Sequence, residues 1–478
     1  MKPSKLVKRL GVPPGPLFGL AIQAAEEVEA SSSDAASWLG RALDPNKPLT
    51  NHHREVSPEA FALLERVRAE TLLQREAQAR RQAEIRPLET PRPYAAWGPH
   101  LVDDAARQQM DNAMRLPVSV AGALMPDAHV GYGLPIGGVL ATEGSVIPYA
   151  VGVDIACRMM LSVYPVGETH LTRYRQDLVG AIRKETAFGT GSGGLRRSHP
   201  VLEDRRWREG PALLRPLHEK AVTQLGSSGG GNHFVEWGLL TPREDLSDEL
   251  RAGQTYLALL SHSGSRAVGF TIANHYTALA QRLRAGLPPE LRALAWLGLD
   301  EEAGQEYWTA MNLAGDYASA NHHLIHKHVA HAAGLKPVLQ VENHHNFAWR
   351  EEHEGGEVFV HRKGATPAGH GVRGIIPGSM GDPGFLVEGR GEAASLDSAS
   401  HGAGRQKGRK EAERTISRQE MQGYLEARGV ELLGGGRDEA PQAYKPIHEV
   451  MTAQQDLVRV LAEFHPRIVR MADDHGRY

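Results

Sequence analysis

The chain of 478 residues contains a single cysteine, Cys157, at the end of the segment GVDIAC. Asp154 stands three residues before it, so a soft thiolate lies near a hard carboxylate in a chain with 24 histidines. This mixture suits a transition metal of borderline softness, and one thiolate can bridge two ions. Taken by itself, Cys157 could equally be a buried core cysteine without a chemical role.

Three histidines stand at the ends of predicted strands. His262 and His345 each follow a short apolar run, and His233 stands just before another. Because the ends of neighbouring strands meet at the mouth of a sheet, we expect these imidazoles to share one site with the thiolate and the carboxylate. Such a set would suit Mn, Zn, Fe or Co. Asn232 and Glu236, close to His233, could hold the ligands in place or bind substrate.

A second segment that could do chemistry is SHGAGR at residues 400–405. Gly402 and Gly404 leave backbone N–H groups open to an anion, and Arg405 adds positive charge. His401 could attack phosphorus there, since an imidazole with a pKa of about 6.5 keeps an unprotonated nitrogen at neutral pH. The alternative is a turn that leads into a basic helix.

Two further segments could contact a nucleotide. The loop PGSMG at residues 377–381 could wrap a ring or a phosphate, although it also reads as a plain Pro-Gly turn. Arg362 and Lys363 follow a predicted strand and carry two charges suited to phosphate.

The elements that must position these residues begin near residue 93, where short apolar runs alternate with glycine-rich turns. The pattern predicts strands at 138–142, 159–164, 256–260, 338–341 and 358–360, and helices at 267–284, 302–333 and 445–464. Five histidines of the second helix are expected to be mostly solvated or capping: His322, His323, His326, His328 and His331. No polar linker interrupts residues 91–478, so we expect one α+β body there.

Residues 1–90 differ from the rest and predict a helical N-terminal extension. Ser57 is expected to cap a charged helix that runs from Pro58 to Arg86. The net charge of −3 excludes a global basic field, which leaves a local groove for any nucleic acid. One cysteine excludes an intrachain disulfide framework, and no apolar run reaches the roughly 20 residues of a membrane span. We therefore expect a cytoplasmic protein without a membrane partner.

Taken together, these segments resemble the RtcB family of GTP-dependent, manganese-dependent RNA ligases. The segment MPDAHVGYG at residues 125–133 resembles the family's opening motif, and the segments named above follow in the family's order, extended by DEAP at 438–441 and AYK at 443–445. The resemblance covers roughly residues 93–465. It implies mixed or antiparallel sheets around a central cleft for metal and nucleotide.

The resemblance also implies roles for individual residues. Two Mn²⁺ ions would be held by Asp154, Cys157, His233, His262 and His345, with Cys157 as the bridge, and His401 would become guanylylated by GTP. The nucleotide contacts would be Asn232, Glu236, Asn346, Pro377, Gly378, Ser379, Met380, Gly402, Ala403, Gly404 and Tyr444. Arg266 and Arg405 would contact the RNA ends.

The implied activity is ligation of an RNA 3′-phosphate or 2′,3′-cyclic phosphate to a 5′-hydroxyl. It would proceed through a GMP–histidine intermediate and a GMP-activated RNA 3′ end, in RNA repair or tRNA processing. The implied partners are RNA ends, such as tRNA halves, with an archease-type activator as a further candidate. Two alternatives stay open: a dinuclear metal-dependent RNA phosphoesterase, which would not need His401, and an end-binding protein that has lost ligation.

The chain departs from the family pattern in four places. Arg158 follows the cysteine where glycine is usual, and Gly384 stands where many members carry a serine that contacts the nucleotide. No lysine follows Lys445, although the family has a C-terminal lysine at the nucleotide. The extension of about 90 residues is additional. The third metal motif of the family has the form His345-Asn346-Phe347 in this chain, which resembles a divergent bacterial branch.

Overall fold

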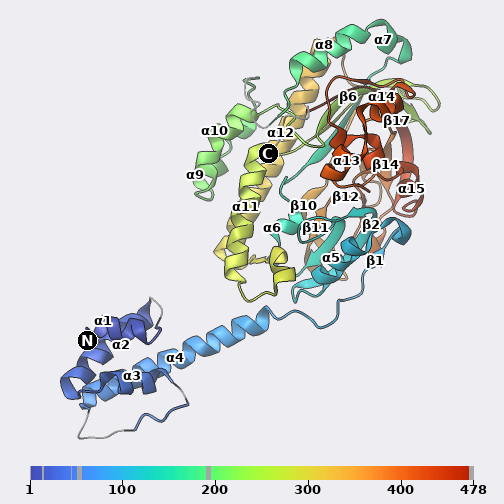
Figure 1. The fold of residues 1–478 in the computed structure, drawn as a ribbon. Coiled ribbons are helices and arrows are strands. Elements are labelled where there is room, and N and C mark those ends of the chain that lie inside the picture. The colour runs from blue at the N-terminus through green and yellow to red at the C-terminus, as the bar shows by residue number, and fades with distance from the viewer. Residues whose placement is uncertain (1, 13–14, 45, 51–55, 190–194, 473–478) are drawn as a thin grey trace. The chain divides into compact units, whose positions relative to one another are not determined.

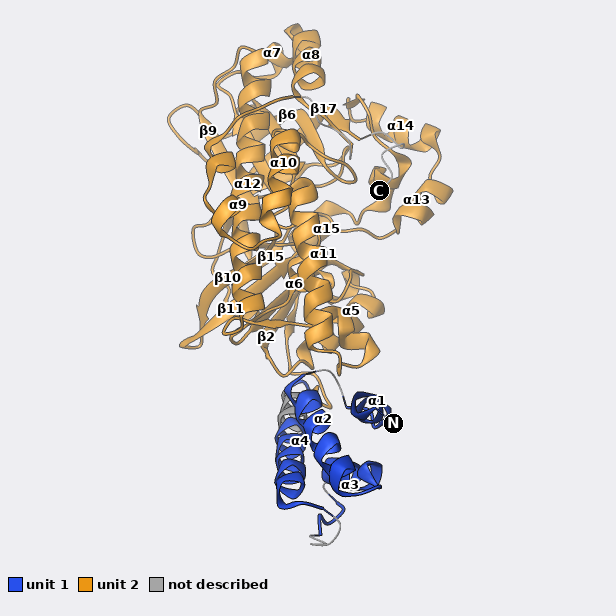
Figure 2. Cartoon of the chain, turned by 90° about the vertical axis from the view of Figure 1, so that its left-hand side faces the viewer, with its two compact units in different colours: residues 1–86 blue, residues 87–478 orange. Residues whose placement is uncertain are grey.

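The computed structural model describes residues 2–12, 15–44, 46–50, 56–189 and 195–472. The chain forms two compact units, residues 1–86 and residues 87–478 (Figure 2). Among the described residues, none of the helices combines the length and the apolar character that a membrane span requires.

The first unit consists of four helices: α1 (Pro3–Arg9), α2 (Pro16–Ser31), α3 (Ala35–Leu43) and α4 (Pro58–Glu84). The side chain of Ser57 accepts a hydrogen bond of 3.1 Å from the Ala60 amide, so α4 begins at the predicted cap. Trp38, Leu39 and Leu64 are buried in a hydrophobic cluster formed within this unit. The predicted helical extension is confirmed, and its helices share a core of their own.

The second unit is built around a large sheet whose strands run in the order β13-β14-β17-β6-β7-β5-β9 (Figure 1). Neighbours in this order are antiparallel, and β16 pairs with β17 in parallel. The strands are β5 (Arg158–Val163), β6 (Phe234–Pro242), β7 (Tyr256–Ser263), β9 (Leu339–His344), β13 (Arg373–Ile376), β14 (Gly384–Gly389), β16 (Glu431–Leu432) and β17 (Val458–Met471).

The side chain of Asn343 joins the two edge strands of this sheet. Its amide donates to the Ile375 carbonyl at 3.2 Å and accepts from the Ile375 N–H at 2.8 Å, which links β9 to β13. The sheet is thereby nearly closed into a barrel. Side chains alternate between its two faces: Leu257 and Leu259 pack outward, in the same cluster as Ile325, whereas Leu260 packs on the inner face.

A second sheet has the order β1-β2-β3-β11-β10. Its strands are β1 (Ala95–Ala96), β2 (Ser119–His129), β3 (Ile136–Thr142), β11 (Gly356–Lys363) and β10 (Asn346–His353). Two short pairs complete the strands: β12 (Ala365–Pro367) with β15 (Ser398–Ser400), and β4 (Ser145–Val146) with β8 (Leu297–Gly298). β15 leads directly into His401.

Helices pack against these sheets. The outer face of the large sheet contacts α12, which also packs on α8 and α11 (Figure 1). The helices are α5 (Asp104–Met114), α6 (Pro148–Val151), α7 (Glu168–Arg173), α8 (Arg175–Glu185), α9 (Arg206–Glu209), α10 (Leu214–Gln224), α11 (Arg266–Leu283), α12 (Glu302–Ala332), α13 (Arg409–Thr415), α14 (Arg418–Glu426) and α15 (Ile447–Thr452). The expected α+β body with mixed sheets is confirmed.

One expectation about local structure is wrong, and a second holds for only some of its residues. Residues 445–464 do not form one helix, because α15 ends at Thr452 and β17 begins at Val458, where pairing with β14 and β6 outweighs local helix propensity. Of the five histidines on α12, His322 and His326 are buried rather than solvated. His326 lies 2.7 Å from the Ser162 hydroxyl and 2.9 Å from the Ser261 hydroxyl, so it belongs to a polar network behind the sheet.

Candidate metal and nucleotide site

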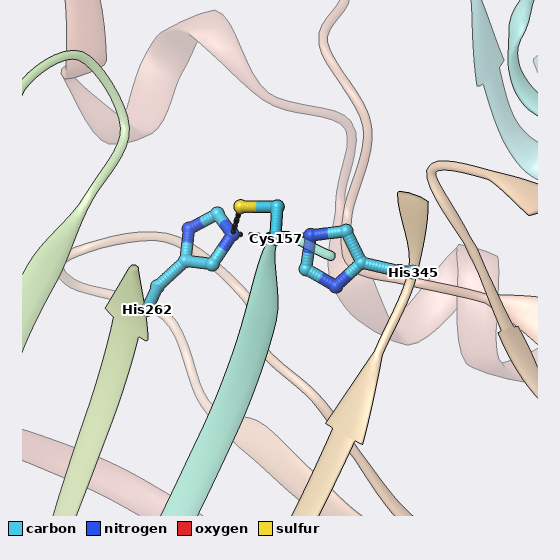
Figure 3. A group of neighbouring side chains, drawn as sticks. All are labelled: Cys157, His262 and His345. Atoms are coloured by element: carbon cyan, nitrogen blue, oxygen red, sulfur yellow. Dashed lines mark hydrogen bonds between the residues drawn. The ribbon is translucent and has the colours of Figure 1, made fainter. Parts of the chain in front are cut away.

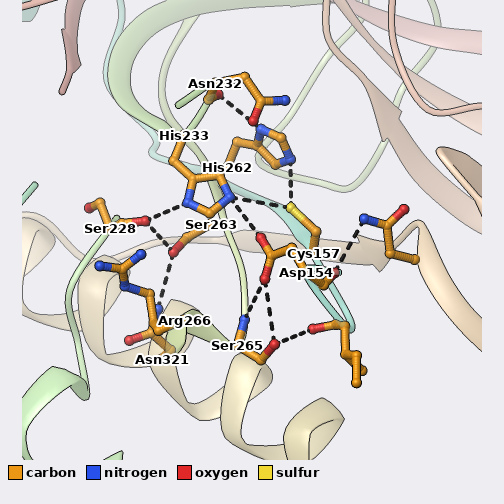
Figure 4. Close-up of polar contacts among 12 residues, drawn as sticks. Asp154, Cys157, Ser228, Asn232, His233, His262, Ser263, Ser265, Arg266 and Asn321 are labelled. Carbon is orange, nitrogen blue, oxygen red and sulfur yellow. Dashed lines mark hydrogen bonds and ion pairs between the residues drawn. The ribbon is translucent and has the colours of Figure 1, made fainter. Parts of the chain in front are cut away.

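Five side chains that the sequence singled out converge at one end of the large sheet (Figures 3 and 4). The Cys157 sulfur lies 3.0 Å from Nε2 of His262 and 3.5 Å from Nε2 of His233. His262 and His345 bring their Nε2 atoms within 3.1 Å, and Nε2 of His233 lies 2.9 Å from a carboxylate oxygen of Asp154. Cys157 therefore does not point into an apolar core away from the histidines.

The alternation of the strands explains this convergence. Met159, Leu161 and Leu260 pack on the inner face of the large sheet. Cys157 lies two residues before Met159 and His262 two residues after Leu260, so the same periodicity turns both side chains inward. β5 lies between β7 and β9 in the sheet, and His345 directly follows β9. Three neighbouring chain segments thus deliver a thiol and two imidazoles to one point (Figure 3).

The loop that carries Asp154 is held from several sides. The Ser265 amide donates to Asp154 Oδ1 at 3.2 Å, and the Ser265 hydroxyl donates to the Ile155 carbonyl at 2.5 Å (Figure 4). A Cβ atom at Gly264 would lie 2.3 Å from the carboxylate oxygens, so glycine is required for this close approach. Asn346 donates from Nδ2 to the Asp154 carbonyl at 3.2 Å.

Hydrogen bonds fix the tautomers of two histidines. Nδ1 of His233 donates to the Ser228 carbonyl at 2.8 Å, and Nδ1 of His262 donates to the Asn232 carbonyl at 3.1 Å. In each ring Nε2 then carries the lone pair and faces the cysteine, which is the arrangement of metal-binding histidines. Burial lowers the pKa of His262 to about 3, so its ring stays neutral and able to bind a cation.

The pKa values of the Asp154 carboxylate and the Cys157 thiol are shifted in opposite directions. Burial acts to raise the pKa of Asp154, but the hydrogen bond and charge of His233, with smaller effects of Cys157 and Arg266, outweigh it and lower that pKa. Burial and the negative charge of Asp154 raise the pKa of the Cys157 thiol well above its usual range. A free thiol is therefore the stable form in the protein without bound cations.

These residues fit a pair of metal ions. They form two groups that share Cys157: Cys157 with His262 and His345, and Cys157 with Asp154 and His233. Within each group the ligand atoms lie within 4.8 Å of one another. In addition, Nδ1 of the buried His345 has no hydrogen-bond partner in the described part of the chain. A thiolate with three imidazoles and a carboxylate matches the preferences of borderline divalent metals.

His401 lies beside this cluster and is held by Asp127. The Asp127 carboxylate accepts from Nδ1 of His401 at 2.7 Å and from its backbone N–H at 3.2 Å. The His401 ring packs against that of His345, with centroids 4.9 Å apart. Because Nδ1 is occupied, Nε2 carries the lone pair and is the ring atom that can act as a nucleophile. Sequence analysis placed Asp127 only within a motif and missed its contact with His401.

Comparison with known proteins decides the family. A family model described as tRNA-splicing ligase RtcB matches residues 109–213 and 208–472. The chain belongs to the RtcB family. It is 35% identical over 394 residues to RNA-splicing ligase RtcB1 of Escherichia coli, which covers 75% of this chain and 92% of that protein. It is 29% identical over 434 residues to tRNA-splicing ligase RtcB of Thermococcus kodakarensis, covering 76% and 90%.

In this RtcB-family protein, two glycine-containing loops that are expected to contact the nucleotide lie side by side, and one of them directly follows His401. A Cβ atom at Gly402 would lie 3.3 Å from the Pro377 carbonyl oxygen, so the two glycine-containing loops touch. Met380 is buried in a hydrophobic cluster against which Tyr444 packs. The members of the two loops are Pro377, Gly378, Ser379 and Met380 in the first, and Gly402, Ala403 and Gly404 in the second. Nucleotide contact by these residues stays a prediction.

Asn346 and Gly384 have local roles of their own. Oδ1 of Asn346 accepts a hydrogen bond from the Gly364 N–H at 2.9 Å. The Asn346 amide therefore links the loop that carries Asp154 to the segment beside His401. A Cβ atom at Gly384 would lie 3.3 Å from Cα of Pro377. The backbone at Pro377 therefore packs closely against Gly384, the position where many relatives are expected to carry serine.

The two arginines predicted to contact RNA lie in different settings. Arg266 donates to the Ser227 hydroxyl at 3.2 Å and to the Gly189 carbonyl at 3.0 Å, close to the metal ligands. Arg405 pairs with Glu439 at 3.1 Å and donates to the Asp438 carbonyl at 2.6 Å. The guanidinium of Arg405 thus has partners within the protein. RNA contact by either arginine stays a prediction.

The charges of Arg362 and Lys363 do not face an open surface as the sequence suggested. Arg362 is buried and forms a two-bond ion pair with Glu351, at 2.6 and 3.0 Å. Lys363 is buried and donates to the carbonyls of Tyr132 and Tyr149, and burial lowers its pKa to about 7. Both side chains therefore bind internal partners and stabilise the structure around the site.

Arg158, the departure next to the cysteine, points to the outer face of the sheet. It is buried, pairs with Glu342 at 3.0 Å and donates to the Gly315 carbonyl of α12 at 3.2 Å. Strand alternation therefore separates Arg158 from the inward-facing Cys157, and the substitution leaves room for the ligands.

Glu236 allows a prediction about stability and pH. Its side chain is buried on β6, and burial raises its pKa well above the usual range. Above a pH of about 4.5, an unfolded chain releases this proton whereas the folded protein keeps it, so stability falls as the pH rises. We expect Glu236→Gln to melt at a higher temperature than the wild type at pH 8, with the difference vanishing toward pH 4.5.

Thermal unfolding followed by circular dichroism at both pH values measures this effect. Glu249→Gln, which changes an exposed carboxylate, is the matched control and should leave the pH dependence unchanged. An equal melting temperature of Glu236→Gln and wild type at pH 8 would show that the carboxyl is not held neutral.

Proposed function

We propose that this protein is an RNA ligase that joins an RNA 3′-phosphate or 2′,3′-cyclic phosphate to a 5′-hydroxyl, with GTP as the activating nucleotide. The observation that carries the proposal is the setting of His401: Asp127 occupies its Nδ1 at 2.7 Å, and its ring packs on the candidate ligand His345. Relatives named RNA-splicing and tRNA-splicing ligases support RNA as the substrate.

The proposed reaction begins at His401. Its Nε2 attacks the α-phosphorus of GTP, an N–P bond forms, and the bond to the β-phosphate oxygen breaks to release pyrophosphate. The Asp127 carboxylate accepts the hydrogen bond from Nδ1–H throughout and offsets the positive charge that develops on the ring.

Two further transfers complete the proposed ligation. An oxygen of the RNA 3′-phosphate attacks the GMP phosphorus, which breaks the N–P bond and returns His401 to its starting form. The 5′-hydroxyl of the second RNA then attacks the activated 3′-phosphorus, GMP leaves, and the hydroxyl proton passes to solvent or to a nearby base. A 2′,3′-cyclic phosphate would first be hydrolysed to the 3′-phosphate.

Two Mn²⁺ ions are proposed as the cofactors. When bound by the cluster around Cys157, they would stabilise negative charge on the transferred phosphoryl groups. The protein's part is to keep the imidazoles neutral and aimed at one point, which the Asn232 and Ser228 carbonyls do through His262 and His233.

A ligation assay tests the proposal. Purified protein with GTP and Mn²⁺ is expected to join an RNA ending in a 3′-phosphate to one beginning with a 5′-hydroxyl. The product should be absent when GTP is omitted, and the assay is run with and without an archease-type activator. RNA cleavage without joining would favour the phosphoesterase, and RNA binding without GTP turnover would favour an end-binding protein.

A further inference from the structure

Tyr132 is an exposed aromatic side chain on a loop close to the reacting residues. Its side chain is 74% exposed, and Val130 beside it is 52% exposed. The loop follows β2, the strand that contains Asp127, and it leads into β3 at Ile136. An exposed ring is common by itself, so its meaning depends on how firmly it is held and on what lies next to it.

The loop that carries Tyr132 is fixed on both sides of the ring. The Gln109 amide donates to the Gly131 carbonyl at 2.5 Å and accepts from the Gly131 N–H at 2.9 Å. Lys363 donates to the Tyr132 carbonyl and, at 2.9 Å, to that of Tyr149. The half-buried Tyr149 ring supports that of Tyr132, with centroids 6.2 Å apart. The backbone that carries the exposed ring is therefore held in place, with Tyr149 as the aromatic neighbour of the ring.

The same contacts lead to the reacting atoms. Gly364, the residue after Lys363, lies so near His401 that a Cβ atom there would be 3.0 Å from the imidazole Cε1. Gly152, three residues after Tyr149, begins the loop that carries Asp154, and a Cβ atom added at Gly152 would lie 3.5 Å from the side chain of Asn346. Lys363 and Tyr149 thus connect Tyr132 to the segments that approach His401 and Asn346.

We propose that Tyr132, supported by Tyr149, forms a stacking platform for the base of an RNA terminal nucleotide. The inference rests on the proposed function, because it assigns a binding site for the RNA of that reaction. An exposed aromatic face on a fixed loop suits a base of any identity, since every base has a π-face. Two exposed side chains are too small a surface for a stable protein partner, which needs several hundred Å².

Binding of short labelled RNAs in the presence of Mn²⁺ tests the platform. Tyr132→Ala is expected to weaken RNA binding roughly 5- to 150-fold, the range of one base–aromatic stack. Tyr132→Phe should bind like the wild type. Tyr174→Ala, which removes another exposed tyrosine between the helices α7 and α8, is the matched control and should change nothing.

A second arm uses RNAs with an abasic nucleotide at the 3′-phosphate end or at the 5′-hydroxyl end. The wild type should lose affinity for one of them, and Tyr132→Ala should show no further loss for that RNA. Equal binding by Tyr132→Ala and wild type, no measurable binding by the wild type, or loss only of activation by an added protein would each overturn the platform. Labelling of His401 by GTP needs no RNA and should survive in Tyr132→Ala, which separates failure of the platform from failure of the ligase.

Discussion

Replacing His401 by alanine is expected to abolish both the covalent GMP adduct and RNA joining. The loss should be on the order of 10⁴-fold or more, because removal of a nucleophile leaves only binding and electrostatic contributions. The protein is incubated with Mn²⁺ and α-labelled GTP, denatured, and examined for retained label. Since His401 belongs to neither candidate ligand group, the variant should bind as much Mn²⁺ as the wild type.

Asp127→Asn provides the sharper comparison for the same step. The side chain keeps its size, but the Nδ1 proton of His401 loses a charged acceptor at 2.7 Å. The amide can instead favour the wrong tautomer, so we expect labelling to slow by roughly 10²- to 10⁴-fold. Label that survives denaturation in His401→Ala would place the nucleotide on another residue. Absence of label in all three proteins, with Mn²⁺ bound, would favour the hydrolase or another nucleotide.

The candidate site could be predicted from the sequence because its residues obey strand geometry. Cys157, His262 and His345 each stand at a strand end with the parity of the inner face, so residue type and position along the chain were sufficient. Asp127 could not be found in this way. It reaches His401 from a different sheet, 274 residues earlier in the chain, and a carboxylate in a motif does not indicate which side chain it will meet.

The errors have a common physical cause. Charge and polarity were taken as signs of solvent or phosphate contact, whereas the structure supplies internal partners from other segments. His326 lies between the hydroxyls of Ser162 and Ser261, and Arg362 meets Glu351 across a hairpin. Buried polar groups require such partners, and their identity depends on tertiary contacts. The helix expected over 445–464 failed similarly, because pairing with two neighbouring strands decides the structure of β17.

Replacing Cys157 by alanine is expected to remove binding of both metal ions, because this residue is the one shared by the two candidate ligand groups. His345→Ala and His233→Ala each alter a single group and should each lower the bound Mn²⁺ by about one ion per chain. Loss of a shared ligand should weaken Mn²⁺ binding by at least about 100-fold. That value is the upper end of the loss caused by replacing residues that only support a metal ligand. Elemental analysis after dialysis and calorimetric titration measure both quantities.

Cobalt offers a readout that does not depend on activity. Co²⁺ bound to the wild type should show a sulfur-to-metal charge-transfer band, which Cys157→Ala must lack and His233→Ala should keep through the second group. The Cys157 side chain is only 4% exposed, so alanine removes a buried group, and Cys157→Ser serves as the size-matched variant. If Cys157→Ala binds Mn²⁺ as tightly as the wild type, the thiol is a core residue. The histidines would then hold metal without a bridge, and the order of losses among the three variants would be reversed.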